Sequence, residues 1–200
     1  MVHRVHNCNP GPATLPLPVL ERVQAEFLDY RGTGMSIMES SHRSPEFDEI
    51  NLTANTLLRK LAGIPDGYQV LFLQGGASLQ FAMVPMNFLT EGTFGDYVHT
   101  GTWSRKAIAE ANIISRARVA ASSEEQKFTR IPGLSEMDFD PAAQYAHITS
   151  NNTIAGTQYH AFPDTGDVPL ICDMSSDILS RRMDISRFGL IFAGAQKNLG

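Results

Sequence analysis

The chain has 200 residues, and its 16 lysines and arginines against 21 aspartates and glutamates give a formal net charge of −5. This balance excludes the basic footprint of a protein that binds nucleic acid irrespective of sequence. No apolar run approaches the roughly 20 residues of a membrane-spanning helix, and the N-terminus lacks the apolar core of a signal peptide. Two cysteines, Cys8 and Cys172, cannot make a disulfide framework. We therefore expect a cytoplasmic protein without nucleic-acid or membrane partners.

The first third of the chain predicts an irregular segment followed by two helices. Prolines and a glycine make residues 1–14 irregular, because proline fixes φ and withholds a donor. Apolar residues recur at helical spacing over residues 19–28. Ser44-Pro45-Glu46 is a typical helix start, and its apolar stripe continues to Leu61 before Gly63 ends it.

Short apolar runs then alternate with helical segments, a pattern that predicts an α/β sheet with mostly parallel strands. Residues 70–73 show no polar alternation, as in a strand covered on both faces. Helices are expected over residues 78–89, with a kink at Pro85, and over residues 104–111. Further strands are expected over residues 94–99, 145–149, 170–172 and 190–193. Little helix separates the last of them, which predicts some antiparallel or irregular connections.

Polar, small or aromatic residues follow the predicted strands, where ligands collect in parallel sheets. These segments are residues 74–78, 100–103, 150–153, 173 and 196–197. In the first of them, Gly75-Gly76-Ala77-Ser78 lies between a strand and a helix, where free N–H groups attract an anion. The segment is neither a P-loop nor a Rossmann fingerprint. An ordinary tight turn is the alternative interpretation.

Lys197 and Asp173 each follow an apolar run, and each has two interpretations. Lys197 is either a solvated surface charge or an amine placed for Schiff-base chemistry. Asp173 either caps the segment that begins at Ser175 or holds a cationic ring nitrogen in a buried place. A carboxylate on a pyridinium nitrogen together with such a lysine is the pairing that pyridoxal phosphate enzymes use.

Four more side chains are candidates for the same site. Trp103 either packs on the sheet edge or stacks on a planar cofactor, and Thr153 either caps a turn or contacts the cofactor's phenolic oxygen. His42 and Arg43 either are surface groups or bind carboxylates and phosphates. No metal site is expected, because the histidines and the cysteine near the N-terminus match no standard zinc spacing.

The sequence resembles the class V aminotransferases, a family of fold-type I pyridoxal phosphate enzymes, and within it the branch that acts on phosphoserine. The segments that carry this resemblance are residues 9–16, 41–44, 72–78, 100–104, 150–157, 173–176 and 193–200. They run along nearly the whole chain. The resemblance implies a cofactor-binding large domain over residues 15–200 that is incomplete at its C-terminus. It also implies that the family's small C-terminal domain is absent from this chain.

The resemblance also implies a role for each candidate residue. Lys197 would form the internal aldimine with pyridoxal 5′-phosphate and later move a proton between the substrate Cα and the cofactor. Asp173 would keep the ring nitrogen protonated. The remaining cofactor contacts would come from Ala77, Ser78, Trp103, Thr153 and Gln196. His42 and Arg43 would bind the acidic groups of the substrate.

The reaction so implied exchanges an amino group between L-glutamate and 3-phosphohydroxypyruvate, giving O-phospho-L-serine and 2-oxoglutarate. It belongs to serine biosynthesis, and in many bacteria the enzyme also serves pyridoxine biosynthesis. The family implies a homodimer. Two alternatives remain: a serine– or alanine–glyoxylate aminotransferase of the same family, and an inactive fragment that acts only as a binding module.

Overall fold

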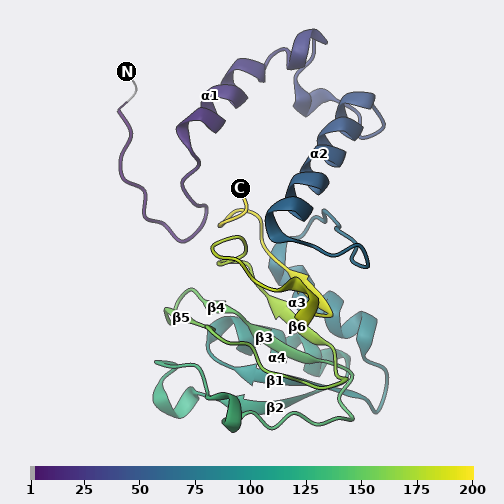
Figure 1. Ribbon diagram of the computed structural model, residues 1–200, viewed down its shortest axis with the longest axis vertical. Helices are drawn as coiled ribbons and strands as arrows, with labels where there is room; N and C mark the ends of the chain where they lie inside the picture. Colours follow the sequence, from purple (N-terminus) through teal and green to yellow (C-terminus); the bar gives the residue numbers. More distant parts are fainter. Residues whose placement is uncertain (1–2) are drawn as a thin grey trace.

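The computed structural model describes residues 3–200, which form a parallel sheet with an extended N-terminal arm above it (Figure 1). The sheet has five strands in the order β2-β1-β3-β6-β7, and every adjacent pair is parallel. The strands are β1 (Phe94–His99), β2 (Arg116–Ser122), β3 (Ala146–Thr149), β6 (Leu170–Asp173) and β7 (Leu190–Phe192). A separate antiparallel hairpin pairs β4 (Asn151–Asn152) with β5 (Thr157–Gln158). The expected α/β class with a mostly parallel sheet is thus confirmed.

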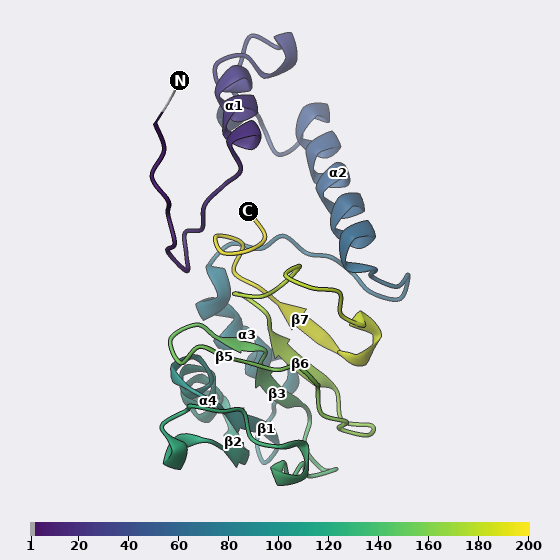
Figure 2. The same cartoon turned by 60° about the vertical axis from the view of Figure 1, so that its left-hand side comes forward.

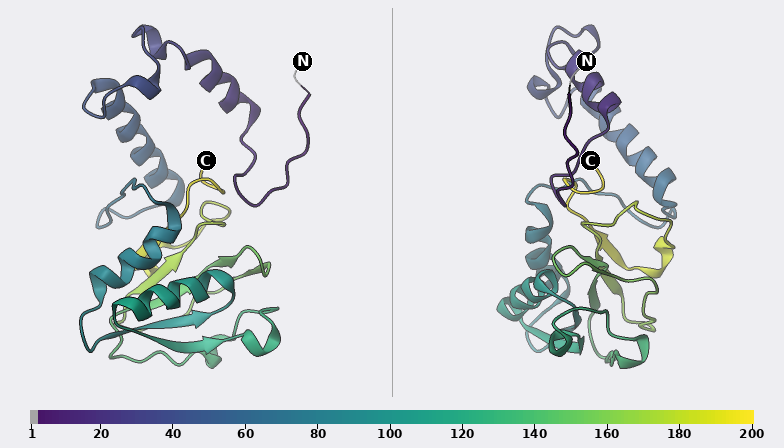
Figure 3. Two further views of the ribbon diagram at one scale, coloured as in Figure 1. Left: turned by 180° about the vertical axis from the view of Figure 1, so that it is seen from behind. Right: turned by 90° about the vertical axis from the view of Figure 1, so that its left-hand side faces the viewer.

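The two faces of the sheet are covered in different ways. Helices α3 (Gly76–Phe88) and α4 (Thr102–Ile114) lie on one face, and irregular segments cover the other, as the right-hand view in Figure 3 shows. Successive strand residues point to opposite faces, so Tyr97 packs under the helices while Val98 packs among the irregular segments. Both faces of these strands are buried, yet β1 and β3 carry polar residues among their apolar ones, such as Asp96 and His147.

The N-terminal arm contains α1 (Leu17–Glu26) and α2 (Pro45–Ala62), and both helices project away from the sheet (Figure 2). The Ser44 hydroxyl caps α2 by accepting a hydrogen bond from the Phe47 amide, and Gly63 ends the helix in the left-handed conformation. Neither helix has a buried residue. Short 3₁₀ turns occupy Tyr30–Gly32, Ile37–Glu39, Glu124–Gln126, Leu134–Glu136 and Ile185–Arg187. No helix among residues 3–200 has the length and apolar character needed to span a bilayer.

Two strand assignments differ from the expectation. Residues 70–73 form no strand, and the side chains of Leu71 and Phe72 are 73% and 52% exposed. They line one side of a groove of about 960 Å³ whose other side is β7, so no neighbouring strand supplies a ladder. The strand β2 was not predicted either, because this edge strand carries Arg116 and Arg118, is partly exposed and shows no continuous apolar run.

A buried ion pair joins β1 to the edge strand β2. Arg118 donates from Nε and Nη2 to the two carboxylate oxygens of Asp96, each at 2.6 Å. The Asp140 amide also donates to Asp96, at 2.7 Å. The Asp96 side chain is fully buried, whereas that of Arg118 is 29% exposed. The pair raises the pKa of Arg118, chiefly through the hydrogen bonds that this arginine donates to Asp96, and it lies in the first half of β1.

Removal of the arginine is therefore expected to cost more stability than removal of the aspartate. Arg118→Met leaves a buried carboxylate with one backbone donor and should lower the free energy of unfolding by about 3–5 kcal/mol, measured by urea denaturation. Asp96→Leu should cost less, because the Arg118 head can turn to water. Arg130→Met, which breaks the exposed pair with Glu136, serves as the control and should change little. Equal losses for the Arg118 and Asp96 variants would contradict this account.

Candidate functional site

The chain gathers its polar loops at one edge of the sheet. Strands β1, β3, β6 and β7 are parallel, so the segments that follow them all leave from the same edge. A cavity of about 280 Å³ opens there, beside the start of α3. Its lining consists of Gly75, Gly76, Ala77, Ser78, Phe81, Trp103, Asn151, Thr153, Asp173, Ser175, Ser176, Gln196 and Lys197. The structure therefore brings together every residue that the sequence assigned to the cofactor.

The start of α3 forms one wall of this cavity. Gly75 precedes the helix with φ of +92°, and a Cβ at this position would lie 2.4 Å from Leu79 Cδ2, so only glycine fits. The first amides of a helix have no intrahelical partner and carry the positive end of its dipole. Gly76, Ala77 and Ser78 supply such amides in the cavity wall, which makes the wall suitable for a phosphate.

Asp173 ends β6 on another wall and is only 4% exposed. Ser175 donates to its Oδ1 twice, from the hydroxyl at 2.6 Å and from the amide at 2.9 Å, and the Ser175 hydroxyl also accepts from the Gly194 amide. Burial raises the pKa of Asp173, while the Ser175 hydrogen bonds and the charge of Lys197 oppose that rise. The carboxylate is thus held rigidly in a place where a cationic partner would stabilise it.

Lys197 lies opposite, in the segment after β7. Its Nζ donates to Thr153 Oγ1 at 3.2 Å and lies 5.3 Å from the centre of the Trp103 ring. The irregular N-terminal segment reaches the same place: a Cβ on Gly11 would lie 2.9 Å from Lys197 Cγ. The Ala13 amide donates to the Gln196 carbonyl at 2.9 Å. The close approach of Gly11 to the lysine was not anticipated from the sequence.

The turn that leads from β1 into α4, just ahead of Trp103 in the first turn of that helix, is fixed by hydrogen bonds on both sides. The Ser104 hydroxyl accepts from the amides of Thr100 and Gly101, at 2.9 and 3.0 Å. On the other side, Asn152 Nδ2 donates to Thr100 Oγ1 at 2.6 Å. The indole Nε1 of Trp103 is buried and has no partner within residues 3–200. A fixed aromatic side chain thus forms one wall of the cavity.

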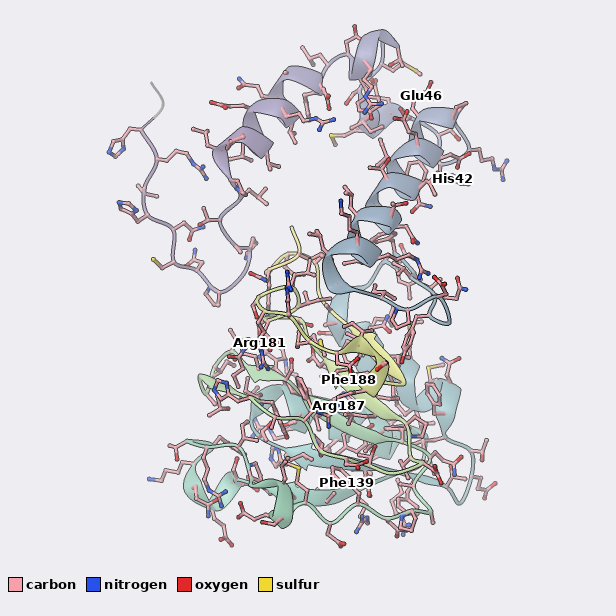
Figure 4. The ribbon with its side chains drawn as sticks, viewed as in Figure 1. His42, Glu46, Phe139, Arg181, Arg187 and Phe188 are labelled. Atoms are coloured by element: carbon pink, nitrogen blue, oxygen red, sulfur yellow. The ribbon has the colours of Figure 1, made fainter. Side chains whose placement is uncertain are left out.

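His42 and Arg43 do not line this cavity. They precede α2 on the arm, and Figure 4 shows His42 beside Glu46, well away from the body that holds Arg181. Among the lining residues, the sequence reasoning did not single out Phe81, Asn151, Ser175 and Ser176 for the cofactor. Asn151 and Ser175 had a usable signal, because each lies two residues past the end of a strand at the shared edge.

With this geometry in hand, comparison with known proteins gives the family. The model of the aminotransferase class-V family matches residues 5–200, and the chain belongs to this family. A phosphoserine aminotransferase of Desulfosudis oleivorans is 61% identical over 201 residues, which is 100% of this chain and 55% of that protein. One of Niallia circulans is 58% identical over 200 residues, with the same two shares.

Solved structures agree with this assignment. A phosphoserine aminotransferase from Bacillus circulans subsp. alkalophilus superimposes with a TM-score of 0.96 at 58% identity, covering 98% of this chain and 55% of that one. A PLP-bound phosphoserine aminotransferase from Trichomonas vaginalis gives 0.89 at 38% identity, with the same coverage. The chain therefore spans about half the length of the relatives that it matches.

The buried carboxylate makes a prediction that involves no ligand. Because the folded-state pKa of Asp173 is raised, its ionisation opposes folding, and the stability linked to it falls as the pH rises from the unfolded value near 4 through the folded one. At pH 7 and without cofactor, Asp173→Asn should therefore raise the free energy of unfolding. The advantage should shrink towards pH 4 in urea titrations. A variant less stable than the wild type at pH 7 would contradict this.

Proposed function

We propose that this protein is a pyridoxal phosphate-dependent aminotransferase that exchanges an amino group between L-glutamate and 3-phosphohydroxypyruvate. The observation that carries the proposal is the cavity itself, in which a helix start, a buried carboxylate and an amine face one volume of about 280 Å³. High identity to phosphoserine aminotransferases over the whole chain supports the choice of substrates. In this proposal, residues 15–200 belong to the cofactor-binding large domain.

The residues of the cavity fit the cofactor group by group. The amides of Ala77 and Ser78 would hold the phosphate. Asp173 would accept a hydrogen bond from the protonated ring nitrogen, whose positive charge would offset the cost of burying the carboxylate. Trp103 would lie against the ring. Thr153 and Gln196 would contact polar groups on the ring, and Lys197 would be the point of covalent attachment. Bound there, pyridoxal phosphate supplies an electron sink for negative charge at the substrate α-carbon.

The chain's own residues then have defined tasks. Lys197, with its amine within 3.2 Å of Thr153 Oγ1, is placed to take a proton from the substrate α-carbon and return it. Asp173 holds a proton at the ring nitrogen, and Ser175 fixes the orientation of that carboxylate. The indole of Trp103 orients the ring and excludes water from one face.

Substrate binding by His42 and Arg43 requires a second copy of the chain, because the arm holds them away from this cavity. The homodimer is supported by apolar side chains that α1 and α2 expose, Val23, Leu52 and Leu61 among them. Arginine and histidine would then meet the acidic groups of the substrate in the partner's site. A cytoplasmic location and roles in serine and pyridoxine biosynthesis complete the proposal, and they rest on the family resemblance.

The activity is tested with the full-length protein and pyridoxal phosphate. L-Glutamate with 3-phosphohydroxypyruvate should give 2-oxoglutarate and phosphoserine, and kcat/KM should exceed that for glyoxylate by at least about 10²-fold, since a site built for a phosphate leaves polar groups unpaired without it. Turnover of glyoxylate but not of 3-phosphohydroxypyruvate would favour the glyoxylate-type aminotransferases instead. Absence of any cofactor binding would favour a binding module.

The assignment of Lys197 is tested by its chemistry. Borohydride treatment of the cofactor-loaded protein should leave pyridoxyl mass on the peptide that contains Lys197, and Lys197→Ala should abolish both the adduct and the visible absorbance of the bound cofactor. Lys127→Ala removes an exposed lysine that directly follows the 3₁₀ turn Glu124–Gln126. It is the matched control and should retain both the adduct and the absorbance. An adduct that survives in the Lys197 variant would refute the assignment.

A further inference from the structure

The β4–β5 hairpin connects two walls of the cavity. Thr153, in the turn between the two strands of this hairpin, accepts a hydrogen bond from Lys197 Nζ. Asn152, on β4, donates to Thr100 in the turn just before α4, the helix that carries Trp103. The hairpin itself has only the two residue pairs Asn151–Gln158 and Asn152–Thr157. Such a short ladder is too weak to hold its own position, so other contacts must fix the hairpin.

The segment that follows Asp173 supplies those contacts. The Ser150 hydroxyl donates to Asp177 Oδ1, and Gln158 Nε2 donates to Asp177 Oδ2 at 3.0 Å. One donor directly precedes β4 and the other is the last residue of β5, so a single carboxylate joins the two strands at the open end of the hairpin. Arg181, labelled in Figure 4, donates to the Tyr159 carbonyl just beyond β5. The Ser150 amide donates to the carbonyl of Asp173, at 3.0 Å, which links the clamp to the strand end that carries the site carboxylate.

Asp177 is only 2% exposed and is not among the residues that line the cavity. Burial of a carboxylate is costly unless hydrogen bonds satisfy it, and both of its oxygens accept from hairpin residues. Because its donors come from the hairpin, the hairpin and the 175–181 segment stabilise each other. A displaced hairpin would leave the buried Asp177 carboxylate without its hydrogen-bond donors. The cost of that burial therefore holds the hairpin in place.

We propose that Asp177 is a positioning residue of the site: by accepting from Ser150 and Gln158 it clamps the β4–β5 hairpin and so sets Thr153 against Lys197. Asp177 touches neither the cavity nor any reacting group. Its effect passes through the hairpin to Thr153 and, by way of Asn152, to Thr100 in the turn before α4, next to Trp103. The part of this inference that concerns cofactor affinity rests on the proposed function, whereas the clamp itself does not.

The clamp is tested without cofactor by hydrogen–deuterium exchange of the full-length protein. Asp177→Ala should raise the exchange rate of amides in residues 150–159 by at least about tenfold, while the amides of α4 stay unchanged. Asp177→Asn should restore slow exchange, because its oxygen still accepts from Ser150 and Gln158 can turn its amide to donate or accept. Asp184→Ala, which removes a surface aspartate that accepts from Ser186, is the control and should leave residues 150–159 unaffected.

A second measurement connects the clamp to the site. By equilibrium dialysis, Asp177→Ala should bind pyridoxal phosphate about tenfold more weakly or worse, and Asp177→Asn should stay within about threefold of the wild type. Gln158→Ala removes one of the two donors and should give an intermediate loss, which keeps the test available if Asp177→Ala fails to fold. Unchanged exchange and affinity in the Ala variants, or an Asn variant as impaired as Ala, would overturn the proposal. If exchange rises while no variant or wild type binds cofactor, the clamp stands and the proposed function fails.

Discussion

The parallel direction of the strands is the constraint on which the site depends. Because β1, β3, β6 and β7 all run the same way, the segments that follow them leave from one edge, although they are separated by up to about half of the chain. The helix α3 starts at this edge too, and its dipole adds a positive end to the same volume. Long irregular connections can therefore vary in conformation without dispersing the site, since the ladder alone sets where each begins.

The two buried carboxylates near the cavity, Asp173 and Asp177, differ in how the cost of their burial is offset. Asp173 lies at a strand end where burial makes ionisation costly, and Ser175 and Lys197 offset only part of that cost. A second carboxylate, Asp177, lies close enough to raise the pKa of Asp173 further, yet its own oxygens are satisfied by the hairpin. The carboxylate of Asp177 thus has both oxygens paired with hairpin donors, whereas that of Asp173 lines the cavity. These different surroundings explain why two buried acids sit within four residues of each other.

The sequence was sufficient for those parts of the site that depend on strand ends, and insufficient for those that depend on distant contacts. Polar residues after apolar runs placed Asp173, Thr153 and Lys197 among the candidates, because an apolar run and the polar residues that follow it are local features of the sequence. The strand expected over residues 70–73 was wrong, since a strand requires a neighbour that no local pattern reveals. Gly11 beside Lys197 and the acceptor role of Asp177 also arise from tertiary contacts across 186 and 27 residues, for which one sequence carries no signal.

The approach of the N-terminal segment to Lys197 shows how these constraints combine. Gly11 leaves no room for a side chain beside the lysine stem, and the Ala13 amide ties the same segment to the Gln196 carbonyl. The lysine is thereby confined on one side by backbone and on the other by Thr153 and the Trp103 ring. A flexible four-carbon side chain loses much of its rotamer freedom in such a channel before any ligand arrives. That entropy is lost when the chain folds rather than when a ligand binds, so the side chain that lines the cavity is ordered in advance of any ligand.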